Sequence, residues 1–188
     1  ITIVPRGRAA GVTWFLPEER DFKFKDQLES ELAVAFGGRV AEEIVLKRIS
    51  TGAANDIKQA TDLAQQMIRS WGMSDNLGPL SYAKGEEQVF LGREIAQHRD
   101  YSEATAQKID EEINKLIKNS YAIAQTVLKE NLDILHKLAE SLLEKETVMG
   151  KELDELIHSL RPGIKLPSKT PEDLMTTAES KETAAGQS

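Results

Sequence analysis

Residues 25–44 read KDQLESELAVAFGGRVAEEI, and an apolar side chain recurs in them at every fourth position. This spacing places the apolar side chains on one face of an α-helix, which can then pack against a core. The stripe consists of Leu28, Leu32, Phe36, Val40 and Ile44. Gly37 and Gly38 lie within the stripe, and each costs a helix about 1 kcal/mol relative to alanine. We therefore expect a helix that another backbone approaches closely at the two glycines, or that bends there.

A second helical pattern follows, and it predicts a helix that begins near Ala53–Asp56 and ends at Trp71. The inward positions should be Ile57, Ala60, Leu63, Ala64, Met67, Ile68 and Trp71. Gly72 is the expected end, because glycine readily adopts the left-handed conformation that closes helices. Residues 72–101 show no period and contain the breakers Gly78-Pro79 and Gly85, so they predict an irregular loop.

Three further apolar stripes in residues 102–160 predict a helical bundle. Asp100 with Glu103 three positions later has the pattern of a capping box that opens the first of these helices. The inward side chains of that helix should be Ile109, Ile113, Leu116, Ile117, Ile123, Ala124, Val127 and Leu128. The second helix should follow Asn131 and the third Gly150, and short links between helices favour antiparallel neighbours.

The N-terminal region has a different character. Residues 1–4 and 11–16 are rich in β-branched and aromatic side chains, and they predict two short strands joined by a basic turn. The expected fold class is therefore mainly α, a helical bundle with a short N-terminal two-stranded β element. Residues 1–162 should form one domain. Residues 163–188 contain hardly any large apolar side chain and are expected to be a disordered tail.

The composition narrows the classes of function. The chain has 188 residues, 40% of them hydrophobic, and its formal net charge of −7 argues against a nucleic-acid partner or a broad surface for anionic membranes. No run approaches the ~20 apolar residues of a membrane span, and no signal peptide is apparent. The absence of cysteine excludes thiolate metal sites and fits a reducing compartment. Because the first residue is Ile1, we expect a piece of a longer protein.

Asp56 is the first candidate for chemistry, because it falls in the first turn of the second predicted helix. Aspartate is common there for a purely structural reason, since its charge faces the positive end of the helix dipole. The same position keeps the carboxylate ionised, and a carboxylate oxygen is an acceptable zinc ligand. Thr51 precedes this turn and is expected to cap the helix. The residues alone leave the structural and the metal-binding interpretations of Asp56 open.

Other polar residues are weaker candidates. The three histidines, His98, His136 and His158, are too far apart for the i, i+4 pair with which a zinc-protease helix binds its metal. Glu42 and Glu43 are adjacent and so point about a hundred degrees apart on a helix. We expect one of them to pair with Arg39 and the other to be solvated.

The second predicted strand offers a candidate substrate-binding edge, formed by Val12, Thr13, Trp14 and Phe15. An extended peptide can add to an exposed strand edge by main-chain hydrogen bonds, a mode that proteases use. The alternative is structural. A half-buried strand would alternate Val12, Trp14 and Leu16 against Thr13 and Phe15 while covering the helices.

Three blocks of sequence, taken in order, resemble the peptidase domain of FtsH-type proteases, which are membrane-anchored, ATP-dependent zinc enzymes. They are Gly37-Gly38-Arg39-Val40-Ala41-Glu42-Glu43, Ser50-Thr51-Gly52-Ala53-Ala54-Asn55-Asp56 and Gly72-Met73-Ser74-Asp75-Asn76-Leu77-Gly78-Pro79. Residues 5–19 look like the strand-turn-strand that follows the zinc helix of that family. The resemblance extends from Ile1 to about Leu160.

The resemblance implies a zinc endopeptidase domain that degrades unfolded, regulatory or membrane proteins. Asp56 matches the third protein ligand of the zinc. The other two ligands are expected in an H-E-x-x-H helix upstream of Ile1, whose glutamate would be the general base, so no catalytic residue is assigned within this chain. ATP is expected only in an upstream domain, and the full-length protein is expected to be a homo-hexamer. A membrane anchor is expected in the missing N-terminal region, with this domain on the cytoplasmic side and the fragment soluble.

A second hypothesis from another class is a non-catalytic helical assembly module of a ring-forming protein. The predicted bundle of residues 102–160 suits both hypotheses, because a helical contact between subunits needs no chemistry. This chain holds one expected ligand, and one carboxylate does not retain zinc usefully, so the fragment is expected to be inactive alone. The presence or absence of an H-E-x-x-H motif upstream of Ile1 distinguishes the peptidase hypothesis from the assembly-module hypothesis.

Overall fold

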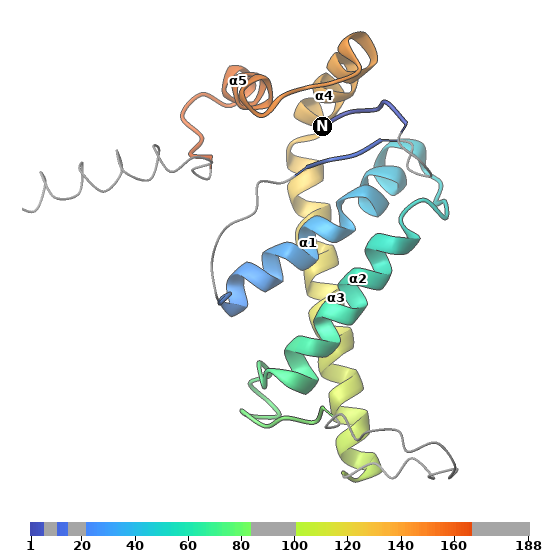
Figure 1. Ribbon diagram of the computed structural model, residues 1–188, viewed down its shortest axis with the longest axis vertical. Coiled ribbons are helices and arrows are strands. Elements are labelled where there is room, and N and C mark those ends of the chain that lie inside the picture. Colours follow the sequence, from blue (N-terminus) through green and yellow to red (C-terminus); the bar gives the residue numbers. More distant parts are fainter. Residues whose placement is uncertain (6–10, 15–21, 84–100, 167–188) are drawn as a thin grey trace, which may run out of the picture. The chain divides into compact units, whose positions relative to one another are not determined.

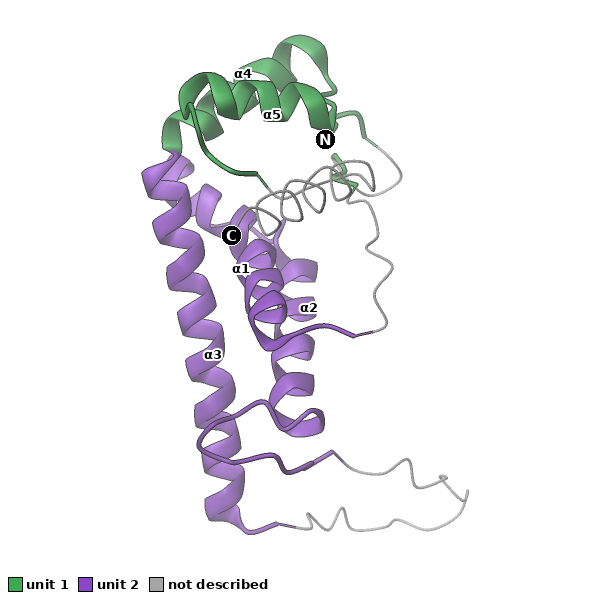
Figure 2. Ribbon diagram, turned by 90° about the vertical axis from the view of Figure 1, so that its left-hand side faces the viewer, with its two compact units in different colours: residues 1–19, 132–188 green, residues 20–131 purple. Residues whose placement is uncertain are grey.

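The computed structural model describes residues 1–5, 11–14, 22–83 and 101–166 (Figure 1). The described part is mainly helical, as the sequence predicts. The chain divides into two compact units, which Figure 2 colours separately. One unit comprises residues 20–131, and the other combines residues 1–19 with residues 132–188. The prediction of one domain over 1–162 stays a prediction, and residues 167–188 of the predicted tail lie outside the described ranges.

The unit of residues 20–131 contains three long helices. Helix α1 spans Lys25–Ala41 and continues into a π-helical turn, η1, at Glu42–Leu46. Helix α2 spans Ala54–Gln65 and also ends in a π-helical turn, η2, at Gln66–Ser70. Helix α3 spans Glu103–Glu130. Helices α1 and α2 pack against each other, and both pack against α3 (Figure 2).

The predicted apolar stripes form the core of this unit. Leu28, Leu32, Phe36 and Val40 of α1 are buried against side chains of the other two helices. Those side chains are Ala60, Ala64, Met67 and Ile68 from α2 and η2, and Ile109, Ile113 and Ala124 from α3. Full burial of a large aliphatic side chain contributes about 1.5–3 kcal/mol, so this cluster holds the three helices together.

Several details of the predicted helices are wrong. Trp71, expected inward, is 48% exposed and follows the last residue of η2, Ser70. Ile123 and Val127 are also exposed, while Ser120 is buried on the inward face of α3. A Cβ atom built at Gly37 or Gly38 would meet no heavy atom of the described residues within 4 Å, so no neighbouring backbone approaches there. The cap of α3 is Ser102, whose side chain accepts a hydrogen bond from the Thr105 N–H; Asp100 lies outside the described residues.

The other unit pairs α4, Leu132–Lys145, with α5, Gly150–Leu160. The Arg161 guanidinium donates two hydrogen bonds of 2.8 and 2.9 Å to the Asp133 carboxylate, which ties the end of α5 to the start of α4. Among the described residues, no helix is both long and apolar enough to cross a membrane.

In the same unit, the N-terminal residues extend between two other segments. Thr2 forms an antiparallel bridge with Val12, through two backbone hydrogen bonds of 2.9 Å, and a second bridge with Thr147. A Cβ atom at Gly11 would lie 2.6 Å from the Thr2 carbonyl oxygen, so the close approach requires glycine. These are isolated bridges, and no regular strand is present in the described ranges, so the predicted two-stranded element is not confirmed.

Candidate metal-ligand helix and its supporting loop

Asp56 lies in the first turn of α2, as predicted, and its side chain is exposed. The helix begins after Ala53, and no side chain caps it. Thr51, expected as the cap, contributes its backbone carbonyl, which accepts a hydrogen bond of 3.1 Å from the Ala54 N–H. Within the described ranges, no hydrogen bond or ion pair is recorded for the Asp56 carboxylate. Its oxygens are therefore available to an external cation at the positive end of the α2 dipole.

The loop before Asp56 is held by Glu42, from the first turn of η1. One carboxylate oxygen of Glu42 accepts a hydrogen bond of 2.6 Å from the Ser50 hydroxyl, and the other accepts one of 3.1 Å from the Ser50 N–H. The Ser50 hydroxyl oxygen in turn accepts a hydrogen bond of 3.0 Å from the Gly52 N–H. Glu42 therefore fixes the backbone of residues 50–52, four positions before the candidate ligand.

Two further groups complete this support. Arg39 places a guanidinium nitrogen 3.6 Å from Glu42, which confirms the predicted ion pair. The hydrogen bonds from Ser50, first from its hydroxyl and then from its N–H, lower the pKa of Glu42, and Arg39 adds a smaller effect. A Cβ atom at position 52 would lie 3.1 Å from the Ser50 hydroxyl oxygen, so Gly52 suits the tight loop.

Glu43 points away from this loop and contacts α3. Its carboxylate accepts a hydrogen bond of 2.5 Å from the Tyr121 hydroxyl and one of 3.4 Å from the Gln125 side-chain amide. The Tyr121 hydrogen bond is the main cause that lowers the pKa of Glu43. Glu43 is exposed, as expected of the second glutamate, and in addition it makes these two hydrogen bonds to α3. The two adjacent acids divide their roles, one holding the α2 loop and the other holding α3.

The third motif, residues 72–79, closes the other end of α2 and η2. Gly72 has φ of +60°, which confirms its prediction as a left-handed cap. From α3, Glu112 reaches this loop and accepts hydrogen bonds of 2.6 Å from both the Ser74 hydroxyl and the Asn76 amide. All three sequence blocks thus lie in one unit, where they join α1, α2 and α3. The remainder of the predicted irregular loop, residues 84–100, lies outside the described ranges together with His98.

Glu112→Gln is expected to make the free energy of unfolding less dependent on pH in the acid range. The hydrogen bonds from Ser74 and then Asn76 lower the pKa of Glu112 in the folded chain. The stabilisation they give is present above the unfolded-state pKa of about 4.3 and is lost as pH falls through the lower folded-state pKa. At pH near 7 the variant should be about 1 kcal/mol less stable than the wild type, and the difference should shrink in acid. Urea unfolding followed by circular dichroism at several pH values measures both.

Glu111→Gln is the matched control, because Glu111 is an exposed neighbour on α3 with no recorded hydrogen bond to this loop. It should leave the pH dependence unchanged. A difference between wild type and Glu112→Gln that stays constant from neutral to acid pH would contradict the assigned role.

The remaining candidates are not brought to Asp56 by any recorded contact. His136 in α4 and His158 in α5 are exposed and belong to the other unit. His158 Nδ1 lies 2.7 Å from the backbone oxygen of Asp154. Over the described ranges, no three side chains of histidine, cysteine, aspartate or glutamate gather so as to hold a metal ion.

The candidate substrate edge is only partly described. Val12 is half-buried at its bridge with Thr2, while Thr13 and Trp14 are exposed, Trp14 by 61%. Trp14 therefore does not follow the inward alternation expected of a half-buried strand. Phe15 lies outside the described residues.

The glutamate support was not predictable from the spacing of the motifs. Glu42 and Ser50 are eight positions apart, and they meet because η1 ends at Leu46 and the next residue, Lys47, turns the chain with φ of +53°. The sequence did contain one signal, since the acid pair Glu42-Glu43, Ser50 and Gly52 all stand within a few residues of the predicted helix start. This signal indicates that a glutamate can reach the loop, but it does not indicate whether Glu42 or Glu43 does so.

Comparison with known proteins confirms the resemblance. The family profile described as peptidase family M41 matches residues 1–156. A protein named ATP-dependent zinc metalloprotease FtsH from Acidobacterium capsulatum is 51% identical over 158 residues, which cover 84% of this chain and 25% of that protein. A protein of the same name from Magnetococcus marinus is 49% identical over 84% of this chain and 24% of its own length.

A third relative reaches further along the sequence. It is an ATP-dependent zinc metalloprotease FtsH 1 from Thermomicrobium roseum, 47% identical over 183 residues, which are 95% of this chain and 28% of that protein. The chain therefore spans about a quarter of the length of the curated relatives it matches.

Proposed function

Because the chain belongs to peptidase family M41, we propose that it is the C-terminal part of a zinc endopeptidase domain in which Asp56 is one of three protein ligands of the metal. The observation that carries this proposal is the exposed Asp56 carboxylate at the start of α2, on a loop that Glu42 holds in place. The names of the relatives, zinc metalloproteases, supply the metal and the reaction class.

The residues present fit one position of a zinc site. The Asp56 carboxylate is a hard oxygen donor without a recorded partner in the described part of the chain, and the α2 dipole favours its ionised form. When bound by two histidines and a carboxylate, zinc supplies a Lewis acid that polarises a scissile carbonyl and acidifies a water molecule. The histidines and the general-base glutamate would come from an H-E-x-x-H segment that precedes Ile1 in the longer protein.

The contribution of this chain is to hold one ligand in a fixed position. Asp56 moves with the first turn of α2, and that turn begins directly after the loop that Glu42 and Ser50 fix. The buried side chains of α2 then anchor the helix to α1 and α3. A ligand held in this way loses little conformational freedom when the metal binds, which favours affinity.

For the substrate, we propose an unfolded polypeptide that adds to the segment of residues 12–15. The Thr2–Val12 bridge supports this proposal, because it shows that the segment can take part in antiparallel pairing. A two-stranded element of residues 1–4 and 11–16 would then become a sheet edge for the substrate. Exposed Thr13 and Trp14 would offer side-chain contacts there.

The remaining features belong to the proposed longer protein. In that protein, residues 1–162 would be part of the peptidase domain and residues 163–188 would be a disordered tail. The proposed features also include an upstream ATPase domain, a membrane anchor with the peptidase on the cytoplasmic side, and assembly as a homo-hexamer. Unfolded, regulatory or membrane proteins are the proposed substrates. The relatives' length and their description as ATP-dependent support the additional domain.

Peptide-mapping mass spectrometry of the intact natural protein tests this function. We expect peptides that precede Ile1 and contain H-E-x-x-H. Upstream peptides that lack both histidines would contradict the peptidase function and favour the non-catalytic assembly module.

A further inference from the structure

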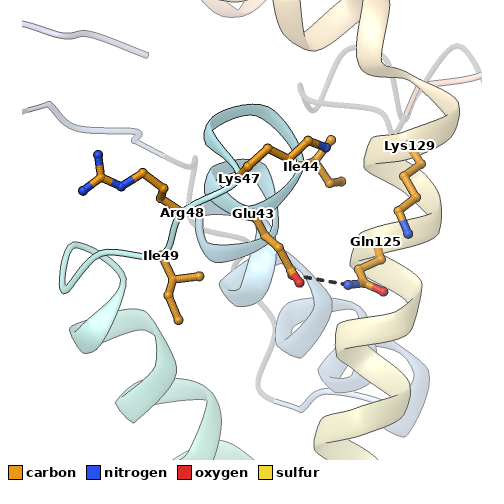
Figure 3. Close-up of a pocket in the computed structure, with 7 residues that line it drawn as sticks. All are labelled: Glu43, Ile44, Lys47, Arg48, Ile49, Gln125 and Lys129. Atoms are coloured by element: carbon orange, nitrogen blue, oxygen red, sulfur yellow. Dashed lines mark hydrogen bonds between the residues drawn. The ribbon is translucent and has the colours of Figure 1, made fainter.

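A pocket separate from Asp56 opens between the end of η1 and the last turns of α3. Its volume is about 570 Å³, within the range of ligand-binding pockets. Figure 3 shows that Lys47, Arg48 and Ile49 come from the chain after η1, while Gln125 and Lys129 come from α3. Glu43 and Ile44 complete the lining. All of these residues belong to the unit of residues 20–131, so the lining that the structure describes lies within one unit.

The pocket carries an excess of positive charge. Lys47, Arg48 and Lys129 are exposed, and none of them forms a direct ion pair within the described ranges, although the charge of Lys129 contributes to lowering the pKa of the Glu43 carboxyl. Among the described lining residues, Glu43 carries the single carboxylate, and it already accepts hydrogen bonds from Tyr121 and from Gln125, the latter drawn in Figure 3. Lys47 and Lys129 thus line a pocket whose carboxylate is already hydrogen-bonded, while the Arg48 side chain extends away from Glu43 (Figure 3), on a chain whose net charge is −7. A ligand with carboxylates would complement this local charge.

The surroundings of the cations are aliphatic. Ile44 and Ile49 line the pocket, Ile49 is 71% exposed, and Leu46 immediately before the turn is 64% exposed. No aromatic side chain is among the lining residues in the described part of the chain, so a nucleobase would find no ring there on which to stack. Lys47 holds the left-handed conformation, with φ of +53°, that glycine would adopt at lower cost.

We propose that this pocket binds an acidic segment of another polypeptide, with carboxylates beside aliphatic side chains. The carboxylates would pair with Lys47 and Lys129, and the aliphatic side chains would cover Ile44 and Ile49. A second copy of this chain would be a different occupant, and the sedimentation experiment below distinguishes it. Binding at this pocket requires neither zinc nor cleavage, so it can be tested independently of the proposed peptidase function.

Fluorescence anisotropy with a short fluorescein-labelled peptide of alternating glutamate and leucine tests this proposal on the full chain. The peptide should bind, and the same peptide with glutamine in place of glutamate should bind much more weakly. The double variant Lys47→Gln/Lys129→Gln should lower the affinity roughly tenfold, since each exposed ion pair contributes modestly. The matched control Lys58→Gln/Lys118→Gln removes the same charge from exposed helical positions and should leave the affinity near that of the wild type.

Three outcomes would overturn the proposal. Equal binding of the glutamate and glutamine peptides would show that the carboxylates are not recognised. An equal loss in the control variant would show a general charge effect instead of a local site. Sedimentation showing that the wild type self-associates and that Lys47→Gln/Lys129→Gln dissociates it would identify the pocket as a contact between copies.

Discussion

Asp56→Asn is expected to lower the zinc affinity of the longer, H-E-x-x-H-containing protein by more than about 100-fold. Changes in groups that merely hold a metal ligand already cost 10–100-fold, and this change neutralises a ligand itself. Peptidase activity on an unfolded polypeptide should fall with zinc occupancy. The fold should survive, because an exposed charge in the first turn of a helix contributes about 0.3–1 kcal/mol. Zinc competition against a chromophoric chelator, with circular dichroism as the folding check, measures both effects.

Asp62→Asn is the matched control for this substitution. Asp62 is exposed on the same helix, six positions further along, and the change in charge is identical. It should leave zinc affinity and activity unchanged. If Asp62→Asn lowers zinc affinity as much as Asp56→Asn does, the effect arises from the charge of α2 and Asp56 is not a ligand.

Glu42→Ala is expected to produce the second largest effect, a loss of about 10–100-fold in zinc affinity of the same protein. Glu42 is not placed on the metal. It accepts the hydrogen bonds from the hydroxyl and the N–H of Ser50, and the Ser50 hydroxyl holds the Gly52 N–H. Without the carboxylate, residues 50–52 gain freedom, and zinc binding must then order them at a cost in free energy. Glu42→Gln retains one side-chain oxygen acceptor and should recover part of the affinity.

The adjacent Glu43→Ala separates this positioning effect from damage to the end of α1. Glu43 contacts Tyr121 and Gln125 of α3 and makes no recorded contact with the α2 loop. It should lower stability while zinc affinity stays near that of the wild type. The positioning role of Glu42 is wrong if zinc affinity falls equally in the Glu42 and Glu43 variants at matched folded fractions.

The helices were predictable because burial imposes a period on the sequence. Leu28, Leu32, Phe36 and Val40 recur at helical spacing, and all four are buried in α1. Their period reports one face of a helix whatever packs against it. The ends were less predictable. Both π-helical turns, η1 and η2, follow helices whose sequence shows no break at those points, and Trp71, directly after the second turn, is exposed.

The position of the candidate ligand, Asp56, could be predicted from the sequence. The side chains that hold its loop in place could not. The place of Asp56 at a helix start follows from local sequence, since Ser50-Thr51-Gly52 interrupts two periodic segments. Which glutamate holds the loop depends on the path of residues 47–50, and neither period nor spacing encodes that path. The capping residue of α3 illustrates the same limit, because Ser102 and Asp100 both suit the cap position by residue type.

The measurement that most directly tests the central claim is anomalous diffraction at the zinc absorption edge from crystals of the longer protein. The account predicts a zinc peak beside the first turn of α2, with an Asp56 carboxylate oxygen at ~2.0–2.2 Å and two histidine nitrogens from the upstream segment. A zinc ion whose ligands do not include Asp56, with the α2 loop still held by Glu42, would contradict it.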